Sequence, residues 1–205
     1  MADYFGKVAM HRRALADALD ELNDEQWATQ SWCDQWSVRQ LAGHLTLGWS
    51  VSTPKFAWAM LRSKGNFNAA NVALSNKLAE QPTSELVADL RRNADHRFTP
   101  PGGDSRAPLS DLIIHSQDMF RPLGIDHEIP VDSILPIADL AVDAKTRRIR
   151  GTDVEGRVTM RATDCDWTNV VDGAPEVEGR LIDLMMVVFG RSQAVGSLSG
   201  DVDAI

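Results

Sequence analysis

The segment Ser110–Phe120 carries two carboxylates and a histidine at helical spacing. At about 100° per residue, Asp111, His115 and Asp118 fall on one narrow stripe of a helix, while apolar residues cover much of the remaining surface. A carboxylate and an imidazole one turn apart can both reach a single cation, as in helical zinc motifs. The same stripe is also typical of a solvated face on which two acids flank an exposed histidine. The spacing alone leaves both interpretations open.

His44 is a further candidate ligand, because it lies in another apolar helix on a flank that can face a neighbour. Gly43 and Gly48 bracket it and permit close backbone approach, although each glycine costs helix stability of about 1 kcal/mol relative to alanine. The alternative is a histidine that forms a hydrogen bond at an ordinary helix contact.

Cys33, upstream, is either a reactive thiol near the site or a small buried residue packed among tryptophans, and the second arrangement is the more usual.

Helical periodicity before residue 147 indicates the elements that must position these residues. It predicts helices at Tyr4–Leu22, from Ser37 past Trp49, after Pro82, from about Pro108 to just before Arg121, and at Asp132–Arg148. Ser37 and Gln40 form the capping-box pattern of the second helix. Asn23–Trp36, with three tryptophans, reads as a loop, and Asn66–Asn76 as a loop or frayed helix. Short loops between antiparallel helices favour an up-and-down bundle.

The hydrophobic period changes after residue 147. Alternating residues between Val154 and Val171 predict strands, and Asp172-Gly173 is a turn signal. Leu181–Gly190 reads as a short apolar helix closed by its glycine. We therefore expect a mainly α-helical protein with a helical bundle over residues 1–147 and a small α+β unit over residues 148–205, whose size makes independent folding marginal.

The composition limits the class of partner. The chain has 205 residues and a formal net charge of -8, which disfavours binding to nucleic acid. Its 2 cysteines, Cys33 and Cys165, give no disulfide framework and suit a reducing cytoplasm. The N-terminal residues read as a mature helix instead of a signal peptide, and no apolar run reaches the length of a membrane span. We expect a soluble, cytoplasmic protein with no membrane partner.

Three groups of motifs occur in order along nearly the whole chain. They are Trp27-x4-Trp32-Cys33-x2-Trp36-Ser37-Val38-x2-Leu41-Ala42-Gly43-His44-Leu45, then Asp111-x3-His115-x-Gln117-Asp118-x2-Arg121-Pro122-Leu123-Gly124, and a tail with Ala162-Thr163-Asp164-x-Asp166-Trp167, Pro175-Glu176-Val177-x-Gly179, Gly190-Arg191 and Leu198-Ser199-Gly200-Asp201. Each motif is modest alone, and the three groups in order are fairly specific. Together they resemble the mycothiol-dependent maleylpyruvate isomerase-like family, part of the DinB-like metal-binding superfamily.

The resemblance implies a DinB-like helical bundle that binds a divalent metal, zinc in the family. One histidine of the second helix, and an acidic residue and a histidine of a later helix, are the implied ligands. Matched position by position, these are His44, Asp111 and His115. The characterised isomerase type has glutamate at the acidic position, and Asp111 is one methylene shorter. A shorter ligand can bind through water, or leave Asp118 to complete the coordination shell.

The resemblance also implies a metal-dependent enzyme with a small electrophilic substrate. Three protein ligands leave an open metal position, where a low-molecular-weight thiol, mycothiol by the resemblance, would lose its proton. The thiolate would then add to the electrophile, for thiol transfer or cis–trans isomerisation. Asp118 is expected to orient His115, and Arg121 is a candidate for a substrate carboxylate, although a surface role is the more usual.

The alternative function is a non-catalytic metal- or ligand-binding module of the same fold, in which the bundle retains a degraded site and the C-terminal unit holds a lipid or partner. The shortened Asp111 and the apolar helix from Leu181 to Phe189 motivate this alternative. The sequence leaves open whether the chain is a monomer or a homodimer.

Overall fold

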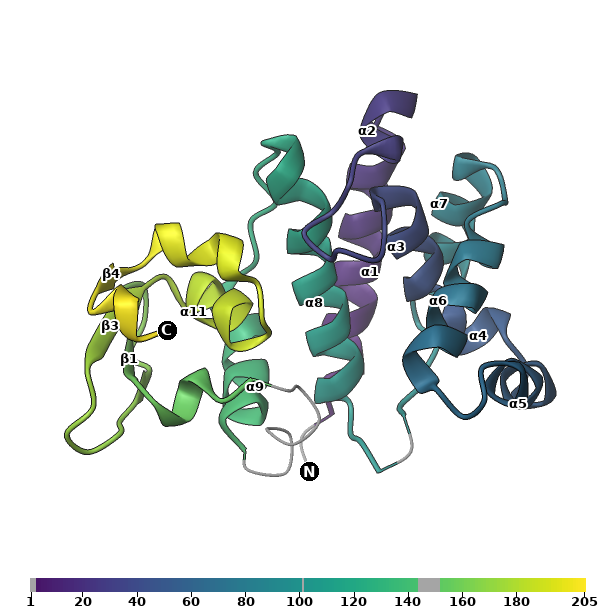
Figure 1. The fold of residues 1–205 in the computed structure, drawn as a ribbon. Coiled ribbons are helices and arrows are strands. Elements are labelled where there is room, and N and C mark those ends of the chain that lie inside the picture. Colours follow the sequence, from purple (N-terminus) through teal and green to yellow (C-terminus); the bar gives the residue numbers. More distant parts are fainter. Residues whose placement is uncertain (1–2, 101, 144–151) are drawn as a thin grey trace. The chain divides into compact units, whose positions relative to one another are not determined.

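The computed structural model describes residues 3–100, 102–143 and 152–205 of the chain. It divides into two compact units, Met1–His127 and Glu128–Ile205. The first unit is helical, and the second combines helices with a 4-stranded sheet (Figure 1). The prediction of a mainly α-helical fold with a small C-terminal α+β unit is thereby confirmed. None of the helices that the structure describes has the length and apolar character needed to cross a membrane.

The N-terminal unit is built from helices that pack their apolar faces together. Its elements are α1 (Phe5–Asp20), α2 (Asp24–Ala28), α3 (Val38–Leu45), α4 (Leu47–Ser50), α5 (Thr53–Arg62), α6 (Phe67–Leu78), α7 (Thr83–Arg92), α8 (Arg106–Phe120) and the 3-10 turn η1 (Arg121–Leu123). α1 packs against α7 and α8, while α3 packs against α6, α7 and α8. Leu15 of α1, Leu41 of α3 and Ile113 of α8 are fully buried. Burial of such a side chain contributes about 1.5–3 kcal/mol.

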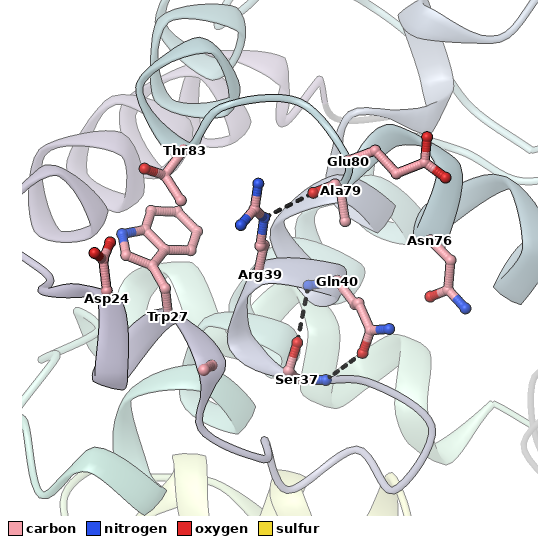
Figure 2. Close-up of a pocket in the computed structure, with 10 residues that line it drawn as sticks. Asp24, Trp27, Ser37, Arg39, Gln40, Asn76, Ala79, Glu80 and Thr83 are labelled. Atoms are coloured by element: carbon pink, nitrogen blue, oxygen red, sulfur yellow. Dashed lines mark hydrogen bonds between the residues drawn. The ribbon is translucent and has the colours of Figure 1, made fainter.

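α3 starts as its capping box predicts but ends earlier than expected. The Ser37 side chain accepts a hydrogen bond from the Gln40 backbone N–H, and the Ser37 N–H donates to Gln40 Oε1 over 2.8 Å (Figure 2). The Thr46 hydroxyl donates to the Gly43 carbonyl over 2.8 Å where the helix ends. The expected single helix is therefore three helices, α3, α4 and α5. Pro54 lies in the first turn of α5, where its missing N–H costs nothing.

The stretch expected to be a loop or frayed helix at Asn66–Asn76 is helical. Asn66 caps α6, because its side chain accepts a hydrogen bond from the Ala69 backbone N–H at 3.0 Å. The missing side chain of Gly43 lets α3 approach α6 closely, since an added Cβ would lie 2.7 Å from the Ser75 carbonyl oxygen. This tertiary packing stabilises a helix whose own apolar pattern is weak. α6 therefore runs directly beside the end of α3.

Part of the expected tryptophan loop is also helical. Asn23 and Gln26 form a capping box that starts α2, and Trp27 of this short helix is buried. The remaining loop is connected to α8, because the Trp32 backbone N–H donates to the Asp118 carbonyl oxygen over 3.0 Å.

The C-terminal unit forms a small sheet with one helix on it. Its elements are α9 (Val131–Val142), η2 (Val154–Gly156), β1 (Thr159–Ala162), β2 (Thr168–Asn169), β3 (Glu176–Gly179), α11 (Leu181–Val188), η3 (Ser192–Ser197), β4 (Ser199–Gly200) and η4 (Val202–Ala204). The strand order is β2-β1-β3-β4, with β1 and β3 parallel and both outer strands antiparallel to their neighbours. α11 packs against β1, β3 and α9. All 8 residues of α11 are buried, so its apolar run belongs to the core and offers no surface for a lipid or partner.

The division between the two units comes before the boundary expected near residue 147. The sequence pattern assigned Asp132–Arg148 to the bundle, whereas α9 packs against α11 in the C-terminal unit. α9 ends at Val142, and residues 144–151, where the rest of the expected helix falls, lie outside the described residues. The expected boundary at residues 147 and 148 falls within this undescribed segment and stays a prediction.

Candidate metal centre

Two packed helices position the three predicted ligands. His44 lies in the last turn of α3, while Asp111 and His115 lie one turn apart on α8. Because residues at i and i+4 lie on one face of a helix, the two α8 side chains point to the same side. α3 packs against α8 in the N-terminal unit. The structure therefore brings together the residues that the sequence proposed.

The donor atoms of these side chains converge. Asp111 Oδ1 lies 3.5 Å from His44 Nε2 and 3.5 Å from His115 Nε2. The two imidazole rings are nearly perpendicular, at 86°, with centroids 5.1 Å apart. All three donor atoms lie within 4.8 Å of one another. Since zinc binds nitrogen and oxygen at about 2.0–2.2 Å, an ion between them would be within reach after small side-chain movements.

The hydrogen bonds of both histidines leave the Nε2 atoms suited to a metal. His115 Nδ1 lies 2.9 Å from Asp118 Oδ2, and His44 Nδ1 lies 3.2 Å from Asn71 Oδ1. Carboxylate and amide oxygens only accept hydrogen bonds, so each Nδ1 is assigned the ring proton as donor. In the neutral ring, Nε2 then carries a lone pair directed at the centre. Metal-binding histidines usually have such an acceptor behind them, so the residues fit a divalent ion.

Asp111 and His115 alter each other's protonation. Burial lowers the pKa of His115, but its hydrogen bonds and charge interactions with Asp111 and Asp118 outweigh burial and raise the pKa to about 9. Desolvation by the surrounding protein raises the pKa of Asp111. Its charge interactions and hydrogen bonds with His44 and His115 outweigh desolvation and hold the pKa well below its ordinary value. The Asp111 side chain exposes 47% of its surface, so solvent reaches the centre at this residue.

Trp36 forms an apolar wall of the candidate centre. Its ring stacks on His44 at 4.7 Å with an interplanar angle of 19°, and lies edge-on to His115 at 6.1 Å. Trp36 is buried, and its Nε1–H has no hydrogen-bond partner among the described residues. Buried donors are almost always satisfied, so an unpaired indole N–H is a ready donor for a bound ligand.

Asp118 lies beside Nδ1 of His115, on the side away from the predicted metal. Asp118 is completely buried, so it is placed to orient His115 and not to contact a substrate. Cys33 is partly exposed and forms a second group with His115 and Asp118, whose ligand atoms also lie within 4.8 Å of one another. Its thiol therefore borders the centre.

Arg121 is held beside the tryptophan loop at the end of α8. Its Nε donates to Gln117 Oε1 over 2.9 Å, and its guanidinium carbon lies 5.5 Å from the Trp32 ring centroid. Gln117 is itself fixed, because its Nε2 donates to the His127 carbonyl oxygen over 2.7 Å. Contact between Arg121 and a substrate carboxylate stays a prediction.

A surface depression near the start of α3 is separate from this centre. It is lined by Trp27, Arg39 and Glu80 among others, and by none of the predicted metal ligands (Figure 2). Arg39 donates to the Ala79 carbonyl oxygen over 2.7 Å and to the Gln81 carbonyl oxygen over 2.6 Å. The guanidinium therefore forms its hydrogen bonds with backbone carbonyl groups just after the end of α6.

Two residues of the centre were missed in the sequence. Asn71, the partner of His44, lies on α6, which the apolar pattern did not predict as a secure helix. Trp36 was assigned to the loop Asn23–Trp36, and its stacking on His44 was not predicted. Its position immediately before the capping box of the His44 helix was the available signal.

Comparison with known proteins agrees with this geometry. The sequence profile of the mycothiol maleylpyruvate isomerase N-terminal domain matches residues 8–120. The match covers more than half of the chain and includes His44, Asp111 and His115. The chain therefore belongs to the family of the mycothiol maleylpyruvate isomerase N-terminal domain, as the motifs predicted.

Solved structures show the same fold over the whole chain. Two crystal structures of the mycothiol-dependent maleylpyruvate isomerase, one of them a mutant with a histidine replaced by alanine, match 100% of this chain and 98% of their own. Their TM-scores are 0.59 for the mutant and 0.55 for the other, each at 13% sequence identity. At this identity, the structural likeness shows a shared fold alone. No curated protein matches the sequence.

Proposed function

We propose that the chain is a divalent-metal-dependent enzyme that uses a low-molecular-weight thiol of the mycothiol type. The reaction would be thiol transfer to a small electrophile or its cis–trans isomerisation. The observation that carries the proposal is the convergence of His44 Nε2, Asp111 Oδ1 and His115 Nε2, with both histidines oriented through Nδ1. Family membership supports the thiol and the substrate class.

Some residues of the centre would bind the metal ion, and others would orient the metal-binding histidines. His44, Asp111 and His115 would hold zinc or a similar ion, Asp118 would fix the ring of His115, and Asn71 the ring of His44. A bound ion with an open position stabilises a thiolate, which is the nucleophilic form of a thiol. Trp36 would exclude water from one side and donate its Nε1–H to the bound ligand. Three ligands from rigid helices favour a catalytic site over a closed structural one.

Turnover of maleylpyruvate with mycothiol tests the proposal. We expect the zinc-loaded protein to isomerise maleylpyruvate only when both the thiol and the metal are present. His44→Ala should lower kcat/KM at least about 100-fold, because it removes one ligand and the ring that Trp36 covers. His96→Ala is the matched control, since His96 is an exposed histidine outside the centre.

Two outcomes would contradict this function. One is unchanged thiol-dependent turnover in His44→Ala. The other is the absence of turnover by the zinc-loaded protein with mycothiol and a panel of small conjugated electrophiles. Metal bound without turnover would instead favour the non-catalytic binding module.

A further inference from the structure

α5 and the start of α6 carry an unusual group of exposed apolar side chains. Trp58 is 60% exposed, Leu61 69% and Phe67 56%, although tryptophan, leucine and phenylalanine are usually buried. None of the 10 residues of α5, all of which the structure describes, is buried. We call Trp58 and Leu61, with the basic residues described below, the α5 patch. Figure 1 shows α5 at the outer edge of the helical unit.

The helical spacing separates α5 into an inner and an outer face. Phe56, whose ring centroid lies 5.8 Å from that of Phe67, is on the side that packs against α6. Pro54, Trp58 and Leu61 follow at i, i+4 and i+7 and form a continuous apolar row that is exposed. Lys55 and Arg62, seven residues apart, border this row on one side. The outer face is therefore amphipathic.

The charge of the α5 patch is opposite to that of the rest of the chain. Lys55, Arg62 and Lys64 are all exposed, and none of them forms an ion pair within the described residues. The sequence from Val51 to Ala79 contains no Asp or Glu, although the whole chain has a net charge of -8. A cationic, apolar face on an acidic protein is complementary to an anionic surface with an apolar interior.

We infer that the α5 patch docks on the surface of an anionic phospholipid bilayer. Tryptophan and leucine beside Lys and Arg are typical of helices that lie in a membrane interface. The acidic remainder of the chain would be repelled by anionic lipids, so the protein would approach with α5 first. Docking of this kind is a surface contact and requires no spanning helix.

A second copy of the chain fits this face less well. A symmetric dimer through α5 would place like charges from Lys55, Arg62 and Lys64 against each other. An asymmetric contact with an acidic region elsewhere would build a ring or an open assembly of several copies. Lipid binding avoids both difficulties.

Sedimentation with vesicles tests the inference with the full-length protein. The probes are vesicles of phosphatidylcholine alone and with about 30 mol % phosphatidylglycerol, because the mechanism requires anionic lipid. We expect binding to the anionic vesicles only, and its loss when salt rises from about 0.1 M to 0.5 M. Trp58→Ser and Leu61→Ser should each weaken binding about tenfold or more. Lys55→Gln, Arg62→Gln and Lys64→Gln should each weaken it about fivefold.

Matched variants outside the α5 patch provide the controls. Val170→Ser removes an apolar side chain that is 68% exposed, and Lys77→Gln removes the same charge from a lysine paired with Glu80. Both should bind like the unmodified protein, and thermal unfolding should show that all variants are folded. The inference is overturned if the protein ignores anionic vesicles, or if the α5 variants bind as well as the controls. A third result would also overturn it: the protein does not bind vesicles, and light scattering shows a dimer that Trp58→Ser abolishes. That result would assign the α5 patch to contact with a second copy of the chain.

Discussion

His115 Nδ1 lies 2.9 Å from Oδ2 of Asp118, a carboxylate that is completely buried. The hydrogen bond fixes the tautomer and the direction of the imidazole whose Nε2 faces Asp111 and His44. The candidate centre thus depends on a residue that would not touch the metal.

Removal of this buried acceptor should weaken metal binding. We expect Asp118→Ala to lower zinc affinity by about 10–100-fold, because the His115 ring loses its orientation. Asp118→Asn should retain most of the affinity, since an amide oxygen can still accept the Nδ1 proton. Competition with a chromogenic chelator measures both, with the exposed Asp126→Ala as control. Equal affinity in Asp118→Ala and the control would refute the orienting role.

The length of the acidic ligand gives a second prediction. Asp111 Oδ1 already lies at equal distances of 3.5 Å from the two Nε2 atoms, and its side chain is about half exposed. We expect Asp111→Glu to retain zinc affinity within about tenfold, because the exposed side leaves room for one methylene. Asp111→Ala should lose at least about 100-fold in affinity, and circular dichroism should show that the variant is folded. Direct calorimetric titration of zinc distinguishes these cases, and full affinity in Asp111→Ala would remove Asp111 from the ligand set.

Metal affinity should depend on pH because a proton competes at His115. The neighbouring carboxylates raise the pKa of His115 to about 9, so a metal must displace a proton at neutral pH. Apparent zinc affinity should rise about tenfold per pH unit up to about pH 9 and then level off. Titrations between about pH 6 and 10 measure this slope, and an affinity independent of pH would contradict the assignment.

The metal-free protein should show the opposite pH trend in its unfolding free energy. A raised pKa in the folded state stabilises the fold below the unfolded pKa and ceases to do so above the folded one. The contribution of His115 should therefore be complete below pH 6.5 and lost as the pH rises to about 9. Urea unfolding across this range measures it. A stability that increases with pH from 6.5 to 9 in wild type but not in His115→Ala would contradict the prediction.

Gly43 offers a test of how the position of His44 is maintained. An alanine Cβ would meet the Ser75 carbonyl at 2.7 Å and the Ala79 nitrogen at 3.0 Å, both of them backbone atoms of the neighbouring segment. We expect Gly43→Ala to destabilise the protein by about 1–3 kcal/mol and to weaken metal binding, because α3 must move away from α6. Gly6→Ala is the matched control, since nothing lies within 4 Å of its added Cβ. Equal Tm values for the two variants would show that the close contact is not needed.

Patterns among residues a few positions apart predicted where helices start and which side chains share a helix face. Ser37 and Gln40 gave the start of α3, because a capping box depends on residues three apart. Asp111 and His115 share a face of α8 for the same reason of short-range geometry. The ranges of α1 and α8 were likewise readable from their periodicity.

Features that depend on tertiary contacts could not be read in this way. α6 is helical because α3 packs closely on it at Gly43. The sequence pattern does not reveal this contact, so it did not predict the hydrogen bond between Asn71 and His44. The apolar face of α9 indicated that this helix is buried, but not that α11 is its partner. The convergence of His44 with the α8 pair was suggested by family resemblance, and the spacing alone left it open.

Metal content is the most direct test of the central claim. The protein should be stripped with chelator, dialysed against zinc and analysed for bound metal together with His44→Ala and His115→Ala. The account predicts about one zinc ion per chain in the unmodified protein and less than about one tenth of an ion in either variant. Absence of stoichiometric metal in the unmodified protein, or about one zinc ion per chain in either variant, would contradict it.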